Sequence, residues 1–293
     1  MRIVKIKGGL GNQLFQYSFA YLLQKKTQEE VKIDMQTYRD LMEDSVRRPR
    51  LLEMNTTLGV AGEKEIRDVC IFKHTGNMLK KSYKIGIAAE GVLNPKYYFE
   101  RDRRYREIDG LLKFQYFDGY WQSWRYVDET WNELAGQFQP KHDLHPSTIK
   151  MIEEVSGVNS VFIGVRRGDY LERESHFGSF GQDYYDPAIK IIKEKVPNPV
   201  FYVFSNDVPW VRNHLKFDDC NVIYREPQDV IDDFEDLLIM AACKHAIIIN
   251  STYHWWGARL KDYDGKIVVA PKQWFFDQKP IDIVPPAWIR VSP

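Results

Sequence analysis

Cysteine is scarce in this chain of 293 residues, and neither sign of charge is in excess. The three cysteines, Cys70, Cys220 and Cys243, lie far apart, which predicts neither a disulfide framework nor a zinc site and indicates a reducing compartment. The 41 Lys and Arg residues balance the 41 Asp and Glu residues, which argues against a nucleic-acid-binding protein with a broad basic surface. The chain lacks a run of about 18 apolar residues and opens on an expected strand, so we expect neither a membrane-spanning segment nor a signal peptide.

The apolar segments that are present predict an α/β fold. The chain exceeds the usual size of a single core, so we expect two domains. In the second half, almost wholly apolar segments alternate with helical patterns, which is typical of a parallel sheet covered on both faces. The strands expected there are residues 160–165, 200–205, 221–224, 246–250 and 266–270, and the helices are residues 184–195, 209–215, 232–243 and 252–260.

The first half opens with a strand over residues 2–7, a glycine loop, a helix over residues 13–26 and a second strand. A polar segment bracketed by prolines, residues 139–146, predicts a linker. We therefore expect a Rossmann-like domain over residues 1–145 and another over residues 146–293, whose last residues either stay in it or pack back on the first. Two such domains facing each other across a cleft suit a nucleotide-sugar ligand.

Two adjacent arginines, Arg166 and Arg167, follow the expected strand that ends at residue 165. Adjacent guanidiniums at the carboxyl end of a strand cost desolvation and repel each other, which a bound phosphate or diphosphate would explain. The carboxyl ends of strands are also where ligands bind in open α/β sheets. The alternative is a surface turn with a solvated arginine pair.

The glycine loop, Gly8-Gly9-Leu10-Gly11-Asn12-Gln13, stands between the first strand and its helix. Glycines let backbone N–H groups approach a phosphate, and the helix offers its positive end. With Asp34 at the end of the second strand, the loop also fits an NAD-dependent oxidoreductase, although Leu14 stands where the third glycine of that fingerprint is expected. A tight turn without a ligand is the simplest alternative.

Two further segments of the second half have both a structural and a functional interpretation. Asn250-Ser251-Thr252 ends the most apolar strand, where Ser or Thr can cap a helix and the same geometry offers N–H groups to an anion. Asp236 is one of four carboxylates in the first turns of the helix expected over residues 232–243, where the helix dipole favours acidic residues. Its functional alternative is recognition of the N1–H and amino group of guanine. The Asp262-Tyr263-Asp264 segment is interpreted as a turn, and no metal site is predicted.

Taken in order along the chain, these motifs resemble those of glycosyltransferase family 11, the α-1,2-fucosyltransferases. The resemblance covers nearly the whole chain with the spacing of the family. The segments that carry it are Gly8-Gly9-Leu10-Gly11-Asn12-Gln13-Leu14-Phe15-Gln16-Tyr17, Gly119-Tyr120-Trp121-Gln122-Ser123 with Tyr126, Arg166-Arg167-Gly168-Asp169-Tyr170, Asp183-Tyr184-Tyr185, Phe204-Ser205-Asn206-Asp207 with Trp210, Asp236-Leu237, and Asn250-Ser251-Thr252-Tyr253 with Trp255-Trp256-Gly257-Ala258.

The resemblance implies a GT-B fold and transfer of L-fucose, with inversion, from GDP-β-L-fucose to the 2-hydroxyl of a terminal β-galactoside. No metal or other cofactor is expected. By the same likeness Arg166 would hold the β-phosphate, Asn250, Ser251 and Thr252 the diphosphate, and Asp236 the guanine. The remaining donor-binding residues expected are Gly9, Gly11, Asn12, Gln13 and Arg167. The likeness to bacterial members implies work in the cytoplasm, either free or at the inner membrane, and leaves the oligomeric state open.

For the acceptor we expect Tyr120, Trp121 and Gln122, although the two aromatic rings could equally be core. Asp169 is the candidate for a catalytic base, with pairing to an arginine as its alternative. One departure from the family stands at Gly164, because the family usually has histidine two residues before the first arginine. The chain has therefore either lost or replaced a contact there, and a non-catalytic GDP-sugar-binding protein is a further alternative.

Overall fold

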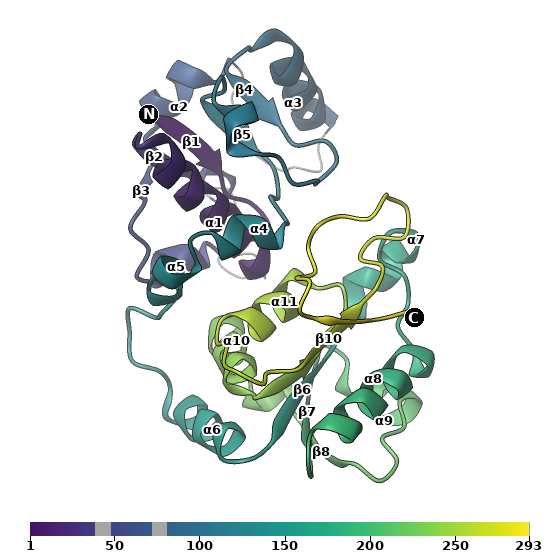
Figure 1. Ribbon diagram of the computed structural model, residues 1–293. Coiled ribbons are helices and arrows are strands. Elements are labelled where there is room, and N and C mark those ends of the chain that lie inside the picture. Colours follow the sequence, from purple (N-terminus) through teal and green to yellow (C-terminus); the bar gives the residue numbers. More distant parts are fainter. Residues whose placement is uncertain (39–47, 72–80, 293) are drawn as a thin grey trace. The chain divides into compact units, whose positions relative to one another are not determined.

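The structure, a computed structural model, describes residues 1–38, 48–71 and 81–292, apart from the side chains of residues 81–84, 169 and 171 (Figure 1). The chain divides into two compact units. Unit 1 consists of Met1–Lys141 with Ile281–Ile283, and unit 2 consists of His142–Pro280 with Val284–Pro293. Each unit holds one parallel sheet with helices packed on it, so the α/β class predicted from the sequence is confirmed.

The sheet of unit 1 has five strands in the order β3-β2-β1-β5-β4, all parallel. The chain leaves β1 towards β2 on one side, whereas β5 pairs with β1 on the other. The carboxyl ends of β1 and β5 therefore flank the point where the strand order reverses, which is the usual ligand position in such sheets. The strands are β1 (Arg2–Lys5), β2 (Val31–Asp34), β3 (Gly59–Val60), β4 (Tyr97–Phe99) and β5 (Tyr116–Asp118).

Helix α1 (Leu10–Thr27) covers this sheet, and its apolar side is buried. It begins three residues before the start predicted from the sequence, because Gly9 takes the N-cap position in an extended conformation. The glycine loop is consequently a short turn that leads directly from β1 into the helix. The other helices of unit 1 are α2 (Glu63–Val69), α3 (Lys81–Leu93), α4 (Trp124–Asp128) and α5 (Trp131–Gln137).

The sheet of unit 2 has six parallel strands in the order β11-β10-β9-β6-β7-β8. Counted from β6, this is the strand order of a Rossmann fold, and it reverses between β6 and β9. The strands are β6 (Ser160–Val165), β7 (Val200–Ser205), β8 (Asn221–Tyr224), β9 (His245–Ile247), β10 (Val268–Pro271) and β11 (Ile289–Val291).

Helices lie on both faces of this second sheet, as its almost wholly apolar strands require (Figure 1). Alternate residues of β6, such as Val161 and Ile163, pack with the aromatic and aliphatic side chains of α8 on one face. Glycine at position 257 of α11 packs against Phe162 and Met240 on the other. The helices are α6 (Pro146–Gly157), α7 (Glu174–Phe177), α8 (Gln182–Lys195), α9 (Val208–His214), α10 (Asp233–Ala242) and α11 (Thr252–Arg259).

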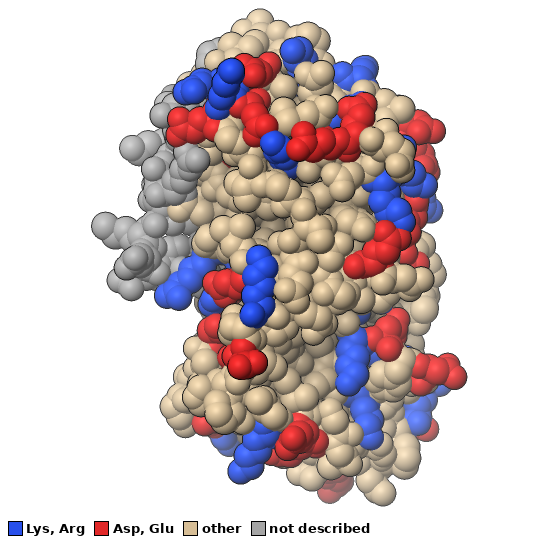
Figure 2. All heavy atoms as spheres, turned by 90° about the vertical axis from the view of Figure 1, so that its left-hand side faces the viewer, with Lys and Arg blue, Asp and Glu red and all other residues tan. Residues whose placement is uncertain are grey.

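Charged side chains of both signs are mixed on the surface. On the face shown in Figure 2, Lys and Arg side chains lie among Asp and Glu side chains without forming a broad patch of one sign. Within the described parts of the chain, no helix is both long and apolar enough to cross a membrane.

Candidate functional site

The structure brings Arg166 and the Asn250–Ser251–Thr252 segment to the same edge of the unit 2 sheet. Strand β6 is buried throughout, and Arg166 is the first residue after it that is not. Because β6 pairs in parallel with β9, with Ile163 opposite Ile247, both strands end at that edge. The strand order reverses there, which makes it the expected ligand position.

A tyrosine in the loop after β6 connects these two segments. The guanidinium of Arg166 lies 5.3 Å from the centre of the Tyr170 ring, within cation–π range. The Tyr170 hydroxyl donates a hydrogen bond to the carbonyl of Asn250 at 3.1 Å. The arginine loop and the strand–helix turn are thereby held together inside unit 2.

Arg167 is directed to the neighbouring strand β7 instead. Its backbone N–H donates to Asn206 Oδ1 at 2.9 Å, and its guanidinium lies 3.6 Å above the Trp210 ring, with Nε 3.5 Å from Asp207 Oδ2. Gly168 has a φ of +35°, and a Cβ there would lie 2.8 Å from the Asn206 amide nitrogen. The two guanidiniums thus have different partners, which removes the crowding that the adjacent arginines suggest in the sequence.

The turn before α11 offers backbone N–H groups to an anion. Ser251 is the N-cap residue, yet its side chain accepts no capping hydrogen bond. Asn250 is buried, and its Nδ2 donates to the carbonyls of Phe177 at 2.6 Å and Trp274 at 2.7 Å, which fixes the turn. The first amides of α11 and the positive end of its dipole therefore lie close to the Arg166 loop, an arrangement that stabilises negative charge.

The four carboxylates at the start of α10 have different surroundings. Asp232 caps the helix by accepting the N–H groups of Phe234 and Glu235, both at 2.8 Å. Asp236 is buried, and its Oδ1 accepts from the guanidinium of Arg225 at 3.1 Å. Burial raises the pKa of Asp236 to about 6, although Arg225 acts in the opposite direction. Glu235 is also buried, but its carboxylate accepts hydrogen bonds from His145 and Thr148, so Asp236 stays the predicted guanine partner among these acids.

The space beside Gly164 is filled by His254 of α11. A Cβ at residue 164 would lie 2.4 Å from His254 Nδ1, so the strand has no room for a side chain. Burial first, and the charge of Arg166 second, lower the pKa of His254 to about 3. An imidazole that stays neutral at physiological pH thus occupies the volume where the family usually has the side chain of residue 164.

In unit 1, the predicted donor loop meets the residues that follow β5. Asn12 Oδ1 accepts a hydrogen bond from Gln122 Nε2 at 2.8 Å. Gln13 is buried, and its Nε2 donates to the carbonyls of Gly8 at 3.2 Å and Arg48 at 2.6 Å. Asn12 and Gln122 therefore form one polar pair at the reversal point of this sheet, whereas Gln13 fixes the loop itself.

The aromatic residues after β5 separate into a core ring and an edge ring. Trp121, at a φ of +54°, is fully buried, and its ring stacks on Phe19 of α1 with centroids 3.7 Å apart. The Tyr120 ring is half-buried, with Lys7 Nζ at 4.8 Å and the Arg103 guanidinium at 5.0 Å from its centroid. The sequence left open whether these rings belong to the core or bind the acceptor. Trp121 is a core residue, and the half-buried Tyr120 stays a predicted acceptor-binding residue.

The sequence analysis missed two buried carboxylates at this edge. Asp118, the last residue of β5, is fully buried against Lys5 and Lys7. Glu100 follows β4, and its Oε2 accepts the N–H groups of Tyr120 at 2.6 Å and Trp121 at 3.1 Å. The available signal was a single charged residue at the end of a short apolar segment, which sequence alone does not distinguish from a solvated turn.

Two other acids were predicted to be functional, Asp34 as a ribose-binding residue and Asp169 as a catalytic base. The carboxylate of Asp34 is buried and accepts hydrogen bonds from the Tyr116 hydroxyl at 2.5 Å and the backbone N–H of Gln36 at 2.8 Å. It is therefore a structural residue of the sheet, which removes the ribose-binding acid that the oxidoreductase alternative needs. The side chain of Asp169 lies outside the described part of the structure, and its role stays a prediction.

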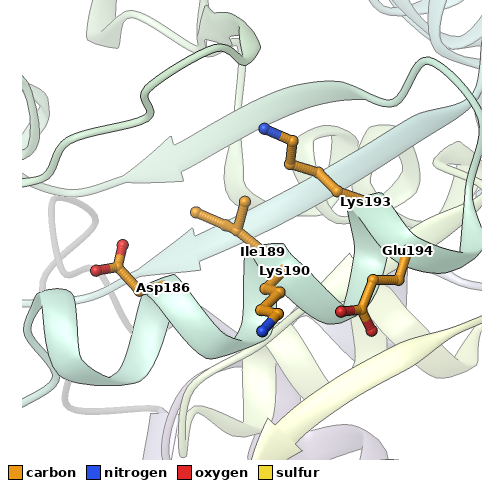
Figure 3. A pocket seen from close by; sticks show the side chains of 5 residues that line it. All are labelled: Asp186, Ile189, Lys190, Lys193 and Glu194. Atoms are coloured by element: carbon orange, nitrogen blue, oxygen red, sulfur yellow. The ribbon is translucent and has the colours of Figure 1, made fainter.

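A pocket of about 460 Å³ lies elsewhere, on the outer side of α8 (Figure 3). All five residues that line it come from this one helix: Asp186, Ile189, Lys190, Lys193 and Glu194. None of the residues predicted for donor or acceptor binding contributes to it. A hollow along one side of a single amphipathic helix is a surface feature, so we do not assign the site there.

Comparisons with known proteins identify the family of the chain. The model of Glycosyl transferase family 11 matches residues 1–292. An alpha-1,2-colitosyltransferase of Escherichia coli is 30% identical over 302 residues, which cover 99% of this chain and 98% of that protein. The O-antigen biosynthesis glycosyltransferase WbnK of Escherichia coli is 30% identical over 301 residues, with coverages of 98% and 99%.

More distant similarities extend to eukaryotic enzymes. Galactoside alpha-(1,2)-fucosyltransferase 2 of Rattus norvegicus is 26% identical over 171 residues, which are 56% of this chain and 48% of that protein. Among solved structures, a mutant of Arabidopsis thaliana FUT1 in complex with GDP covers 92% of this chain with 12% identity and a TM-score of 0.47, and 70% of that structure is matched.

Proposed function

Because the chain belongs to glycosyltransferase family 11, we propose that it transfers L-fucose, with inversion, from GDP-β-L-fucose to the 2-hydroxyl of a terminal β-galactoside. Support for the linkage and the sugar comes from the rat relative, whose name states an alpha-(1,2)-fucosyltransferase acting on galactosides. A second candidate is transfer of colitose in the same linkage, because the colitosyltransferase of Escherichia coli matches the chain over its whole length.

The observation that carries the proposal is the meeting of Arg166 with the start of α11 at the β6–β9 edge. Cleavage of the bond between the sugar C1 and the β-phosphate oxygen leaves negative charge on GDP. A guanidinium and preorganised N–H groups stabilise that charge most strongly as it develops. In this proposal Arg166 binds the β-phosphate, and the 250–252 turn binds the diphosphate without help from a metal.

The remaining roles follow from placement. Asp236 accepts hydrogen bonds from guanine, beside Arg225, which follows β8 at the same edge of the sheet. Asn12, with the turn of Gly9 and Gly11, is the part of unit 1 that we propose for donor binding. Tyr120 and Gln122 bind the acceptor galactoside.

We place the reaction in the cytoplasm. Support comes from the three cysteines, which are all free thiols, two of them buried. Free thiols are typical of proteins from reducing compartments.

The test is a transfer assay with purified protein, a panel of nucleotide sugars and a panel of β-galactosides. We expect GDP release and an α-1,2-linked product with GDP-fucose, or with a colitosyl donor if the second candidate holds. Stabilisation by GDP without transfer to any acceptor would instead support a non-catalytic GDP-sugar-binding protein. Stabilisation by UDP or NAD, but not by GDP, would contradict the proposed donor.

A further inference from the structure

Two buried carboxylates stand at the ends of neighbouring strands in unit 1, and they differ in their partners. Glu100 follows β4 and Asp118 ends β5, in register with Phe99, and the backbone N–H of Glu100 donates to the Asp118 carbonyl at 2.9 Å. Asp118 is fully buried, and Glu100 is 7% exposed. Both groups are costly to desolvate, so each needs a reason to be there.

Asp118 is neutralised by its surroundings. Its carboxylate lies 3.4 Å from Lys5 Nζ, contacts Lys7 Nζ and accepts a hydrogen bond from the Tyr97 hydroxyl at 2.8 Å. Burial alone would raise its pKa, but the two ammonium groups outweigh it and hold the pKa well below the usual range. Asp118 is therefore an ionised residue that stabilises the sheet, and it has no tendency to take up a proton.

Glu100 forms no ion pair with the described residues, although Lys7 and Arg103 lie near enough to affect its pKa. Its Oε2 accepts the N–H groups of Tyr120 and Trp121, whereas its Oε1 has no hydrogen-bond partner among the described residues. Burial raises its pKa, against the opposing effects of those two N–H groups, Lys7 and Arg103. Holding the 119–121 turn needs only one of the two carboxylate oxygens, so a structural role leaves Oε1 unexplained.

Glu100 lies next to residues that we propose for acceptor binding. An exposed loop follows Glu100, yet its side chain turns inward and accepts the backbone N–H of Tyr120. Tyr120 stands two residues before Gln122, which pairs with Asn12. Burial raises the pKa of Glu100, and the charges of Lys7 and Arg103 oppose that effect. Burial also raises the pKa values of Tyr98 and Tyr126, and the charge of Glu100 raises them further.

We propose that Glu100 is the general base that takes the proton from the acceptor hydroxyl. This inference rests on the proposed function. The acceptor oxygen forms its bond to C1 of the sugar as the bond between C1 and the β-phosphate oxygen breaks, the bonding electron pair leaves with GDP, and the hydroxyl proton passes to Oε1. A base acts through a direct hydrogen bond or through one water, so an oxygen just below the surface is suitable.

The decisive variant is Glu100→Gln. The amide oxygen of Gln still accepts the N–H groups of Tyr120 and Trp121, so the turn and the thermal unfolding midpoint are retained, but the side chain no longer takes a proton. General-base catalysis contributes about 10²–10⁴-fold, and we expect kcat to fall by that factor while GDP affinity stays unchanged. The wild-type rate rises with pH as the base ionises, and the variant loses this rise. Glu133→Gln, at an exposed carboxylate of α5, is the matched control and keeps the wild-type rate and profile.

Three results would overturn the inference: a kcat of Glu100→Gln within threefold of wild type, a pH rise that persists in that variant, or its loss in Asp169→Asn instead. If Glu100→Gln unfolds, Glu100→Asp decides: if residue 100 is the base, kcat falls and the midpoint of the pH rise shifts, whereas an unchanged kcat and midpoint would overturn the inference. Failure of the proposed function is distinguished by the wild-type protein, which then gives no transfer with any donor at any pH.

Discussion

The carboxyl edges of the two sheets have the same topology but opposite chemistry. In both units the strand order reverses beside the first strand, between β1 and β5 in unit 1 and between β6 and β9 in unit 2. In unit 2 that edge presents Arg166 and the start of α11, which favour an anion. In unit 1 it presents Glu100 beside Tyr120 and the Asn12–Gln122 pair, which suit hydroxyl groups.

This difference shows that the fold fixes where a ligand binds and the residues after each strand fix which ligand it is. The first residue after β6 is an arginine, Arg166, whose guanidinium lies over the Tyr170 ring at this edge. In unit 1, Lys5 at the end of β1 and Lys7 just after it pair with Asp118, so these two charges are neutralised within the protein. This contrast is the reason why we propose unit 2 for the donor diphosphate and unit 1 for the uncharged acceptor.

The largest effect is expected at Asp118, where two lysines of unit 1 are neutralised. Asp118→Asn leaves two ammonium groups uncompensated in a buried site and should lower the free energy of unfolding by about 3–5 kcal/mol. The lowered pKa of Asp118 means that its contribution is complete above the usual carboxyl range and is lost as pH falls towards the folded-state value. Urea unfolding of both proteins from pH 7 down to pH 3 measures this. A variant as stable as wild type at pH 7 would show that the two sheet edges do not differ in this way.

Arg166→Ala tests the anionic side of the comparison. Loss of a charge-stabilising donor should slow transfer by about 10²–10³-fold and leave the unfolding midpoint unchanged, because Arg166 follows the strand and is only partly buried. Arg212→Ala, an exposed arginine of α9 that pairs with Glu226, is the control. The readouts are GDP release and thermal unfolding, and turnover near the wild-type level in Arg166→Ala would contradict the assignment.

Gly164→Ala tests whether the imidazole of His254 has taken the space beside β6. The new Cβ would lie 2.4 Å from the ring, so we expect a loss of about 1–3 kcal/mol in unfolding free energy. In the Gly164→Ala, His254→Ala double variant the clash is absent, and the cost should be less than the sum of the two single changes. Gly136→Ala is the control, since a Cβ in that helix position meets no atom within 4 Å. Additive costs in a double-mutant cycle would exclude the pairing.

The smallest effect is a pH dependence of nucleotide binding. With the pKa of Asp236 at about 6, the carboxylate that accepts from guanine is lost as pH falls through that value, and GDP affinity should drop about tenfold from pH 7 to pH 5. The same raised pKa makes the protonated form favour folding, so this residue adds stability at low pH and loses it as pH rises through 6. Calorimetric titration of wild type and Asp236→Asn is the measurement. An equal pH dependence in the two proteins would assign it to another group, such as the phosphates.

The sequence was a good guide where elements are long and apolar. The strands predicted over residues 160–165, 200–205 and 221–224 have those bounds in the structure. The first two are largely buried and have a continuous apolar signal, whereas the third is a partly exposed edge strand. Strands β3, β4, β5 and β11 were missed. Each has two or three residues, which is too short for a periodic pattern to be recognised, and each is a strand only because a neighbour supplies its hydrogen bonds.

The candidate site was predicted in the same uneven way. Arg166 and the Asn250–Thr252 segment stood out because charge and caps directly after apolar strands need a reason, and the structure brings them to one edge of the sheet. Glu100 and the neutral His254 could not be found, because a single acid or histidine in a mixed segment has no signal of its own. Their properties come from burial and from partners far away in the chain.

The sequence by itself determined the α/β class, the strand–turn–helix units and the residue types at each strand end, since these depend on local periodicity and on side-chain chemistry. The tertiary structure alone decided which charged side chains form buried ion pairs within a unit and which lie at a proposed ligand site. That distinction depends on distances between residues remote in sequence and on the exclusion of water around them. These two factors explain why Asp118 forms an ion pair with Lys7, whereas Oε1 of Glu100 has no hydrogen-bond partner among the described residues.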